Sequence, residues 1–315
     1  MNTIEILRTV SKLVYENVKD LAGTKEAVAG DFGRGVGGDI SRNIDMVAEK
    51  TVIDYLKEIN FHCVILGEEC GRIELSSNPK GFIIMDAIDG TTNAVRGLPF
   101  FCCSLAFATD EKLSSITDAA ITNLSTGDVY WASKGKGSFL NDKSISVHKE
   151  KPVYKVVGIN TSASPPELIG RFTPIFEKYH IRHLGANALE MAFFAQGLID
   201  VFIDFRKKIR IQDIAAGYLL VKEAGGLLMD ENLQPLDSDI SYETRLSFVA
   251  ASSKEILDEI FYSHNSSPHN IPDQPLSYFQ NWIDIQLYLS EQQHFLHLWI
   301  LLLVISFLQR KWGQT

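Results

Sequence analysis

The chain has 315 residues, of which 45% are hydrophobic and 22% charged, and its formal net charge is −9 at pH 7. This composition is typical of a globular protein and excludes a largely disordered or collagen-like chain. The acidic balance argues against nucleic acid as a partner, because a nucleic-acid binder neutralises phosphates with a basic surface. A small anionic substrate would need a local positive site or metal ions.

The four cysteines are Cys63, Cys70, Cys102 and Cys103, and their spacing matches no zinc-binding pattern. A chain this long with so few cysteines is not a disulfide scaffold, so we expect reduced thiols in a reducing compartment such as the cytoplasm. The first 20 residues contain acidic side chains and no apolar core segment. We therefore expect no secretory signal.

The N-terminal half combines predicted helices with a predicted antiparallel sheet. Apolar residues three or four apart over residues 4–21 predict an amphipathic helix, and Ser41 is expected to cap a second helix that ends near Ile59. Short apolar runs predict strands, at residues 63–66, 81–85 and 104–108, and a meander of further strands continues to about residue 148.

From residue 153 onward strands and helices alternate, which predicts an α/β arrangement. The segments are a strand at 153–160, helices at 165–179 and 188–199, a strand at 201–205, a helix at 213–226 ended by Gly225 and Gly226, a strand at 246–252 and a helix at 253–262. We therefore expect an α+β domain over residues 1–150, an α/β domain over residues 151–262 and a tail over residues 263–315.

The tail differs in composition from the rest of the chain. Residues 264–315 contain no alanine and hold seven of the ten glutamines. The apolar run at 295–308 is shorter than the roughly 20 residues that span a bilayer. Three interpretations stay open: a packed or dimer-forming helix, a C-terminal membrane anchor, or a shifted reading frame.

The segment GFIIMDAIDGTTN, residues 81–93, places two carboxylates at the end of an apolar strand. Asp86 and Asp89 repel each other at this spacing unless a cation neutralises them, and oxygen ligands without a nearby His or Cys favour Mg²⁺ over zinc. Gly90 lets a ligand approach the backbone, and Thr91 and Thr92 are expected to open a helix whose free N–H groups suit a phosphate. The segment therefore predicts a metal site beside an anion site.

Two further acidic residues are candidates for the same site. Glu68 follows the predicted strand at 63–66, and ligand-binding residues of α/β folds gather at strand ends. Asp213 lies at the start of a predicted helix, where an aspartate is also typical as a cap. Taken alone, Glu68 is better explained as part of a solvated turn and Asp213 as a helix cap. Together with Asp86 and Asp89, the two residues favour the metal site.

Four sequence blocks together resemble the inositol monophosphatase family of Mg²⁺-dependent, lithium-sensitive phosphatases. They are GEE at 67–69, DAIDGTTN at 86–93, GKGSFLN at 135–141 and QDIAAGYLLVKEAGG at 212–226. The resemblance covers residues 1–262 and implies a layered αβαβα sandwich. The segments GDISRNID and DGTTNAVRGLPFF are similar to the archaeal branch, which often combines inositol-1-phosphatase with fructose-1,6-bisphosphatase activity.

The resemblance also implies roles for individual residues. One Mg²⁺ would be held by Glu68, Asp86 and the carbonyl of Ile88, a second by Asp86, Asp89 and Asp213, and a third near Glu68. The attacking water would be oriented and deprotonated by Thr91 paired with Asp45, or by Glu68. The phosphate would be bound by Gly90, Thr91 and Thr92.

The chain departs from the family pattern at a few positions. Ala87 replaces the usual proline and Gln212 the common tryptophan, but neither would supply a metal ligand. Arg206 stands where animal inositol phosphatases carry an acidic residue that contacts an inositol hydroxyl. A basic side chain there favours a second phosphate, unless residues 206–210 form a solvated loop. Arg182, and Arg34 in a glycine-rich loop expected to close over the metals, are further candidates for phosphate binding.

We therefore expect a cytoplasmic Mg²⁺-dependent phosphomonoesterase that acts on fructose 1,6-bisphosphate, inositol 1-phosphate or both. Such a reaction belongs to carbohydrate metabolism and, for the bisphosphate, to gluconeogenesis. The resemblance implies a homodimer. Two alternatives stay open: a bisphosphate-nucleotide or NADP(H) phosphatase, and a non-catalytic protein that binds a partner or a membrane through its tail.

Overall fold

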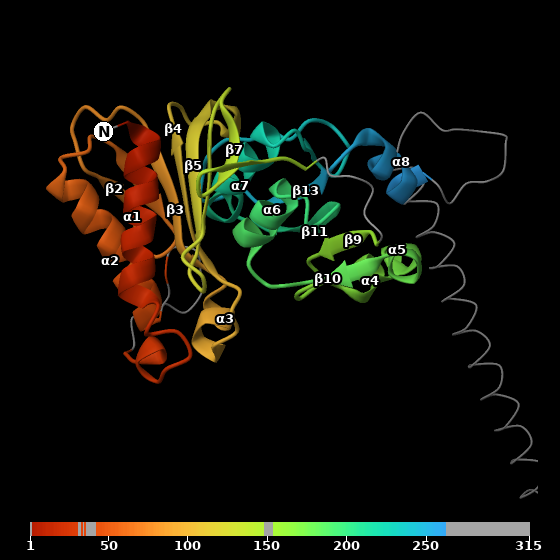
Figure 1. The fold of residues 1–315 in the computed structure, drawn as a ribbon, viewed down its shortest axis with the longest axis horizontal. Coiled ribbons are helices and arrows are strands. Elements are labelled where there is room, and N and C mark those ends of the chain that lie inside the picture. The colour runs from red at the N-terminus through yellow and green to blue at the C-terminus, as the bar shows by residue number, and fades with distance from the viewer. Residues whose placement is uncertain (1, 31–32, 34, 36–41, 148–153, 263–315) are drawn as a thin grey trace, which may run out of the picture. The chain divides into compact units, whose positions relative to one another are not determined.

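Helices and sheets alternate in layers in the computed structural model, which describes residues 2–262 except 31–32, 34, 36–41 and 148–153 (Figure 1). The described α-helices are α1 (Thr3–Val18), α2 (Asn43–Glu58), α3 (Thr91–Arg96), α4 (Pro166–Arg171), α5 (Thr173–Lys178), α6 (Asn187–Ala195), α7 (Ile211–Glu223) and α8 (Lys254–Tyr262). Helices α1 and α2 confirm the two helices predicted for the N-terminal part. Helix α2 begins after Arg42 as its N-cap and not after Ser41, which lies outside the described residues.

The first sheet has eight strands in the order β2-β1-β3-β4-β5-β6-β7-β8. Its strands are β1 (Val64–Gly67), β2 (Gly71–Glu74), β3 (Phe82–Asp89), β4 (Cys102–Ala108), β5 (Ile116–Asn123), β6 (Val129–Ser133), β7 (Gly137–Leu140) and β8 (Lys143–Ile145). The pair β1 and β3 is parallel, whereas the other neighbours are antiparallel. The carboxyl ends of β1 and β3 therefore lie at the same edge of the sheet.

The second sheet has five strands in the order β10-β9-β11-β13-β12. Its strands are β9 (Val156–Ile159), β10 (His180–Arg182), β11 (Val201–Ile209), β12 (Leu227–Met229) and β13 (Leu246–Ala251). The alternation of these strands with α4 to α8 confirms the predicted α/β character of the second half.

Helices cover both faces of the first sheet (Figure 1). Helix α1 packs on β4 and β5, and α2 packs on β3, whereas α7 packs on β3, β4 and β5 from the other side. Helix α6 contacts both α7 and β11 of the second sheet, and α8 packs on β13. This arrangement confirms the layered αβαβα sandwich.

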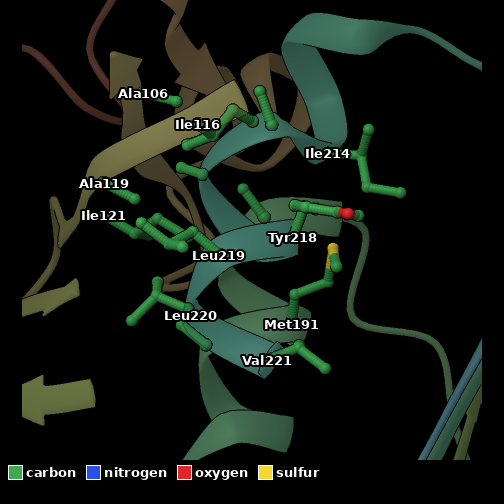
Figure 2. Close-up of a cluster of buried hydrophobic side chains, with 14 of the residues drawn as sticks. Ala106, Ile116, Ala119, Ile121, Met191, Ile214, Tyr218, Leu219, Leu220 and Val221 are labelled. Carbon is green, nitrogen blue, oxygen red and sulfur yellow. The ribbon is translucent and has the colours of Figure 1, made fainter. Parts of the chain in front are cut away.

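Helix α7 lies in the core, and each of its residues from Ile211 to Val221 is buried. A helix that is enclosed on all sides needs an apolar or small residue at nearly every position, and α7 meets this need. Figure 2 shows Ile121 of β5 beside Leu219 and Leu220 of α7. Gly217 allows α6 to approach, because a Cβ there would lie 2.5 Å from Met191 Sδ. The core therefore fixes the N-terminus of α7, where Asp213 lies.

Strand β3 is longer than the predicted strand at 81–85 and continues to Asp89. Its pairing with β4 shifts register between Asp86 and Asp89. A register shift of this kind bends a strand and redirects its side chains, which is common beside functional sites. Both carboxylates are therefore held by a buried strand rather than by a mobile loop.

A carboxylate on α8 joins this helix to the residue before β9 and to the C-terminal end of α5. Glu259 accepts hydrogen bonds from Tyr179 Oη at 2.7 Å and from the ammonium groups of Lys155 and Lys178. These hydrogen bonds, above all that of Lys155, lower the pKa of Glu259 to about 2. A carboxylate whose pKa is lower in the folded than in the unfolded chain stabilises the fold above its unfolded pKa.

We expect Glu259→Gln to lower the free energy of unfolding by about 1 kcal/mol at pH 7, the upper end for partly exposed ion pairs. The stabilisation by the ionised carboxylate is lost as the pH falls from about 4.5 toward 2. The loss of free energy of unfolding in the variant should therefore be less than half as large near pH 3 as at pH 7. Urea unfolding of both proteins at the two pH values measures the difference. An equal loss at both would show that the ion pairs contribute nothing.

None of the described helices combines the length and the apolarity that crossing a bilayer needs. The apolar run at 295–308 lies outside the described residues. The described residues all belong to one compact unit, Met1–Asn265. The expected boundary near residue 150 also falls outside the described residues, so the division into three domains stays a prediction.

Candidate metal centre and active site

Three carboxylates from separate elements meet at the shared edge of β1 and β3. Glu68 follows β1, Asp86 belongs to β3, and Asp213 lies in the first turn of α7. One oxygen from each lies within 4.8 Å of the others. Since ionised carboxylates this close repel one another, the arrangement needs a nearby positive charge, from a side chain or a metal ion, or protonation. A set of oxygen donors alone suits a hard divalent cation such as Mg²⁺.

Burial makes the repulsion in this cluster severe. Asp86 is 3% exposed, Asp213 is 5% exposed and Glu68 is 9% exposed. Burial, followed by the charge of Asp86, raises the pKa of Glu68 well above the ordinary glutamate value. Burial, followed by the charge of Asp89, does the same to the pKa of Asp86. Groups perturbed in this way gather at functional sites, although structural networks also produce them.

Asp89 is directed toward the N-terminus of α6. Its Oδ1 accepts the N–H of Asn187 at 3.2 Å and its Oδ2 that of Ala188 at 2.6 Å. Burial and the charge of Asp213 raise the pKa of Asp89, and the Ala188 N–H opposes this shift. An ionised carboxylate accepts up to about four hydrogen bonds or metal contacts. Asp89 therefore connects the two halves of the chain and keeps capacity for a cation.

The hydroxyl of Thr91 lies between two acceptors. Thr91 Oγ1 is 3.1 Å from Asp45 Oδ1 of α2 and 3.1 Å from the carbonyl oxygen of Ile88. Burial raises the pKa of Asp45 to about 7, although the N–H of Arg42, 2.8 Å from Asp45 Oδ2, opposes this shift. A hydroxyl has one hydrogen, so it donates to only one of these two acceptors at a time. The lone pairs of its oxygen can in addition accept a hydrogen bond from water.

The turn between β3 and α3 requires glycine. Gly90 adopts a φ of +92°, and a Cβ there would lie 3.0 Å from that of Ala186. Asn93 Nδ2 donates to the carbonyls of Phe100 and Leu184, both at 2.7 Å. Through Asn93, the turn that is predicted to bind the phosphate is therefore joined to the segment that precedes α6. Thr92, the third predicted phosphate contact, is exposed on α3.

The comparisons with known proteins agree with this geometry. The model of the inositol monophosphatase family matches residues 3–266. The chain belongs to the inositol monophosphatase family. The resemblance seen in the sequence is thereby confirmed, as is the expected class of phosphoric monoester hydrolase at the level of the family. The family is metal-dependent, and the acidic cluster formed by Glu68, Asp86 and Asp213 is suited to hold a metal ion.

Individual relatives of the family carry related names. A fructose-1,6-bisphosphatase/inositol-1-monophosphatase of Methanothermobacter thermautotrophicus is 32% identical over 262 residues, which cover 80% of this chain and 92% of that protein. A bifunctional NADP phosphatase/NAD kinase of Methanococcus maripaludis is 29% identical over 80% of this chain and 47% of that protein. The crystal structure of an inositol monophosphatase–fructose 1,6-bisphosphatase matches with a TM-score of 0.72 and 30% identity, covering 82% of this chain and 98% of that structure.

Three basic residues, Arg206, Arg182 and Arg34, are predicted to contact phosphate groups of the substrate. Arg206 is paired with the fully buried carboxylate of Asp204 and donates from Nη1 to the carbonyl of Ser162 at 3.1 Å. Arg182 is exposed on β10, where its Nη1 donates to the carbonyl of Ile181 at 2.7 Å. Arg34 lies outside the described residues. Their contact with substrate stays a prediction.

Two residues at this family site escaped the sequence analysis. Glu49 of α2 accepts the N–H groups of Glu69 at 3.0 Å and Cys70 at 2.8 Å, and it lines one pocket with Asp45 and Asp86. Its position four residues after Asp45, on the same helix face, was the signal that would have found it. Arg210, which pairs with Glu68 and Asp213, was seen only as part of a basic run.

Proposed function

We propose that this chain is an Mg²⁺-dependent phosphatase that releases phosphate from a phosphorylated sugar or polyol. Fructose 1,6-bisphosphate and inositol 1-phosphate are the expected substrates. The observation that carries the proposal is the meeting of three buried carboxylates within 4.8 Å beside the Thr91–Asp45 pair, in a chain of this family.

The residues proposed to hold two or three Mg²⁺ ions are Glu68, Asp86, Asp89, Asp213 and the carbonyl of Ile88. Their donors are all oxygen atoms, which suit Mg²⁺, and Arg210 alone offsets only part of the negative charge of the buried cluster. When bound, the ions would lower the pKa of a coordinated water and neutralise the phosphate oxygens and the leaving alkoxide. The protein supplies no serine or cysteine nucleophile in this proposal.

The Thr91–Asp45 pair is proposed to orient the attacking water. The Asp45 carboxylate is the stronger of the two acceptors around Thr91 Oγ1, so the hydroxyl proton points toward it. A lone pair of Thr91 Oγ1 is then available to accept a hydrogen bond from water, and the proton lost by that water can pass through the hydroxyl to Asp45. Glu68 is the alternative group for the same task, and the phosphate would lie against the N–H groups of Gly90 and Thr91 with Thr92 nearby.

The preference for a bisphosphate follows from the basic residues on the second sheet. Arg206 directs Nε and Nη2 to Asp204 and Nη1 to Ser162, and among the described contacts two of its five N–H groups are not engaged. A guanidinium fixed in this way is well placed to bind a second phosphate. The name of the Methanothermobacter relative supports the same pair of substrates. Finer expectations accompany the proposal: cytoplasmic location, a homodimer, inhibition by lithium and a role in gluconeogenesis.

Phosphate release tests both the activity and the substrate. We expect release from fructose 1,6-bisphosphate and from inositol 1-phosphate with MgCl₂, and loss of both in EDTA. Arg182→Gln should lower kcat/KM for the bisphosphate about tenfold or more, the effect of losing one charge-assisted hydrogen bond. The kcat/KM for inositol 1-phosphate should not change. Arg182 is preferred to Arg206 because it is exposed and its loss leaves no buried acid unpaired.

Arg245→Gln is a matched control, because Arg245 is likewise exposed and donates to backbone carbonyls of neighbouring residues, those of Tyr242 and Thr244. A control variant that changes the substrate ratio as much as Arg182→Gln would contradict the assigned contact. Release from NADP but from neither sugar phosphate would favour the activity named for the Methanococcus maripaludis relative. Release from none of the three would support a non-catalytic protein.

A further inference from the structure

Arg210 lies among the carboxylates proposed to hold the metal. Its Nη1 is paired with Glu68, and its Nη2 is 2.9 Å from Asp213 Oδ1. Its Nε lies 3.2 Å from the same Asp213 oxygen. The three side chains are 17%, 11% and 7% exposed, respectively. These contacts are therefore largely buried charge-assisted hydrogen bonds, which are stronger than surface ion pairs.

Arg210 connects residues that are remote in the sequence. Glu68 lies 142 residues before it, whereas Asp213 follows three residues later in the first turn of α7. The backbone N–H of Arg210 also donates to Asp213 Oδ2 at 2.9 Å, which fixes the main chain at the same point. One guanidinium thus holds a carboxylate of the first half of the chain against a carboxylate of the second.

The carboxylates of the cluster carry more negative charge than Arg210 can neutralise. Glu68, Asp86 and Asp213 would carry three negative charges, and Arg210 forms ion pairs with two of them, Glu68 and Asp213. Removing one partner of a buried ion pair leaves a buried charge without compensation, which is strongly destabilising. A bound divalent cation would compensate the same oxygens, so the guanidinium matters most when the metal is absent.

We infer that Arg210 is an internal counter-ion that keeps Glu68 and Asp213 assembled before a divalent cation binds and, by doing so, lowers the affinity for that cation. The inference rests on the proposed metal centre. Arg210 is a positioning residue in this role, since it acts through the ligands and not on the substrate. Loss of its charge should destabilise the metal-free chain more than the metal-bound chain. By the thermodynamic cycle, the variant then binds the metal more tightly.

The test compares the full chain with Arg210→Gln in EDTA and in saturating MgCl₂, without substrate. The melting temperature of Arg210→Gln should fall about 3–6 °C further in EDTA than in MgCl₂. Titration calorimetry with MgCl₂ at 20 °C should show about tenfold tighter binding, which is the same difference measured directly. Arg210→Lys keeps the charge but loses the planar fork, and it should fall between the two proteins.

Arg72→Gln is the matched control, because Arg72 forms a 3.3 Å ion pair with Glu74 on β2 in which both side chains are exposed to solvent. It should change neither the response to MgCl₂ nor the affinity. If the melting temperature of Arg210→Gln fell equally in EDTA and in MgCl₂, or if the variant bound Mg²⁺ more weakly than the wild type, the counter-ion role would be overturned. A wild-type chain that does not respond to MgCl₂ would instead overturn the metal centre itself, and with it this role of Arg210.

Discussion

Asp86→Asn should abolish Mg²⁺-dependent phosphate release while making the metal-free protein more stable. Asp86 is the most buried of the three clustered carboxylates, and it is proposed to contact two of the Mg²⁺ ions. An amide is a poor ligand for a hard cation, so we expect phosphate release to fall by about 100-fold or more. The amide also removes a negative charge that is buried beside Asp89 and Glu68, which relieves the repulsion.

The stability gain in EDTA should raise the melting temperature by about 2–4 °C, the shift that about 1 kcal/mol produces in a chain of this size. The asparagine oxygen can still accept the Ile88 N–H that Asp86 Oδ1 accepts at 3.1 Å, so the local turn is retained. Calorimetric melting in EDTA and phosphate release in MgCl₂ measure the two effects.

Asp200→Asn provides a control for Asp86→Asn in the second sheet. Asp200 directly precedes β11, is half-buried and accepts the N–H of Val156, the first residue of β9, at 2.8 Å. We expect this variant to keep full activity. If Asp86→Asn retained more than a tenth of the wild-type activity, Asp86 would not be a metal ligand.

The sequence predicts the fold well wherever local pattern and burial agree. The period of apolar residues in α1 and the two glycines after α7 are local signals, and Gly225 indeed adopts a φ of +84° just beyond the last turn. The short strands β2 and β10 were not predicted, because three or four residues carry too little pattern to be distinguished from turns. The segment 165–179 forms two short helices that meet at Phe172, since Pro174 cannot continue the hydrogen bonding of the first.

The candidate site is predictable in its residue types but not in its long-range pairing. The acidic residues and the turn at Thr91 are recognisable in the sequence because they follow predicted strands or begin predicted helices, where ligand-binding residues of α/β folds gather. The bonds from Asn187 and Ala188 to Asp89, which join residues almost 100 positions apart, depend on how the two halves dock. No local pattern encodes that docking, and the same holds for the pairing of Arg210 with Glu68.

The hydroxyl of Thr91 offers the most direct test of how water is activated. We expect Thr91→Val to lower kcat for phosphate release by about 100-fold or more, the usual contribution of a group that positions or transfers a proton. Valine has nearly the same shape as threonine but lacks the oxygen that lies 3.1 Å from Asp45 Oδ1. Because Thr91 is not a proposed metal ligand through its side chain, the rise in melting temperature caused by MgCl₂ should be unchanged.

Thr91→Ser restores the hydroxyl without the methyl group, and it should recover most of the activity. Asp45→Ala removes the acceptor instead, and its effect on kcat should be close to that of Thr91→Val if the two groups act as one unit. The double variant should then be no slower than either single variant. Additive losses in kcat would instead mean that Thr91 and Asp45 act separately, and full activity of Thr91→Val would assign water activation to Glu68.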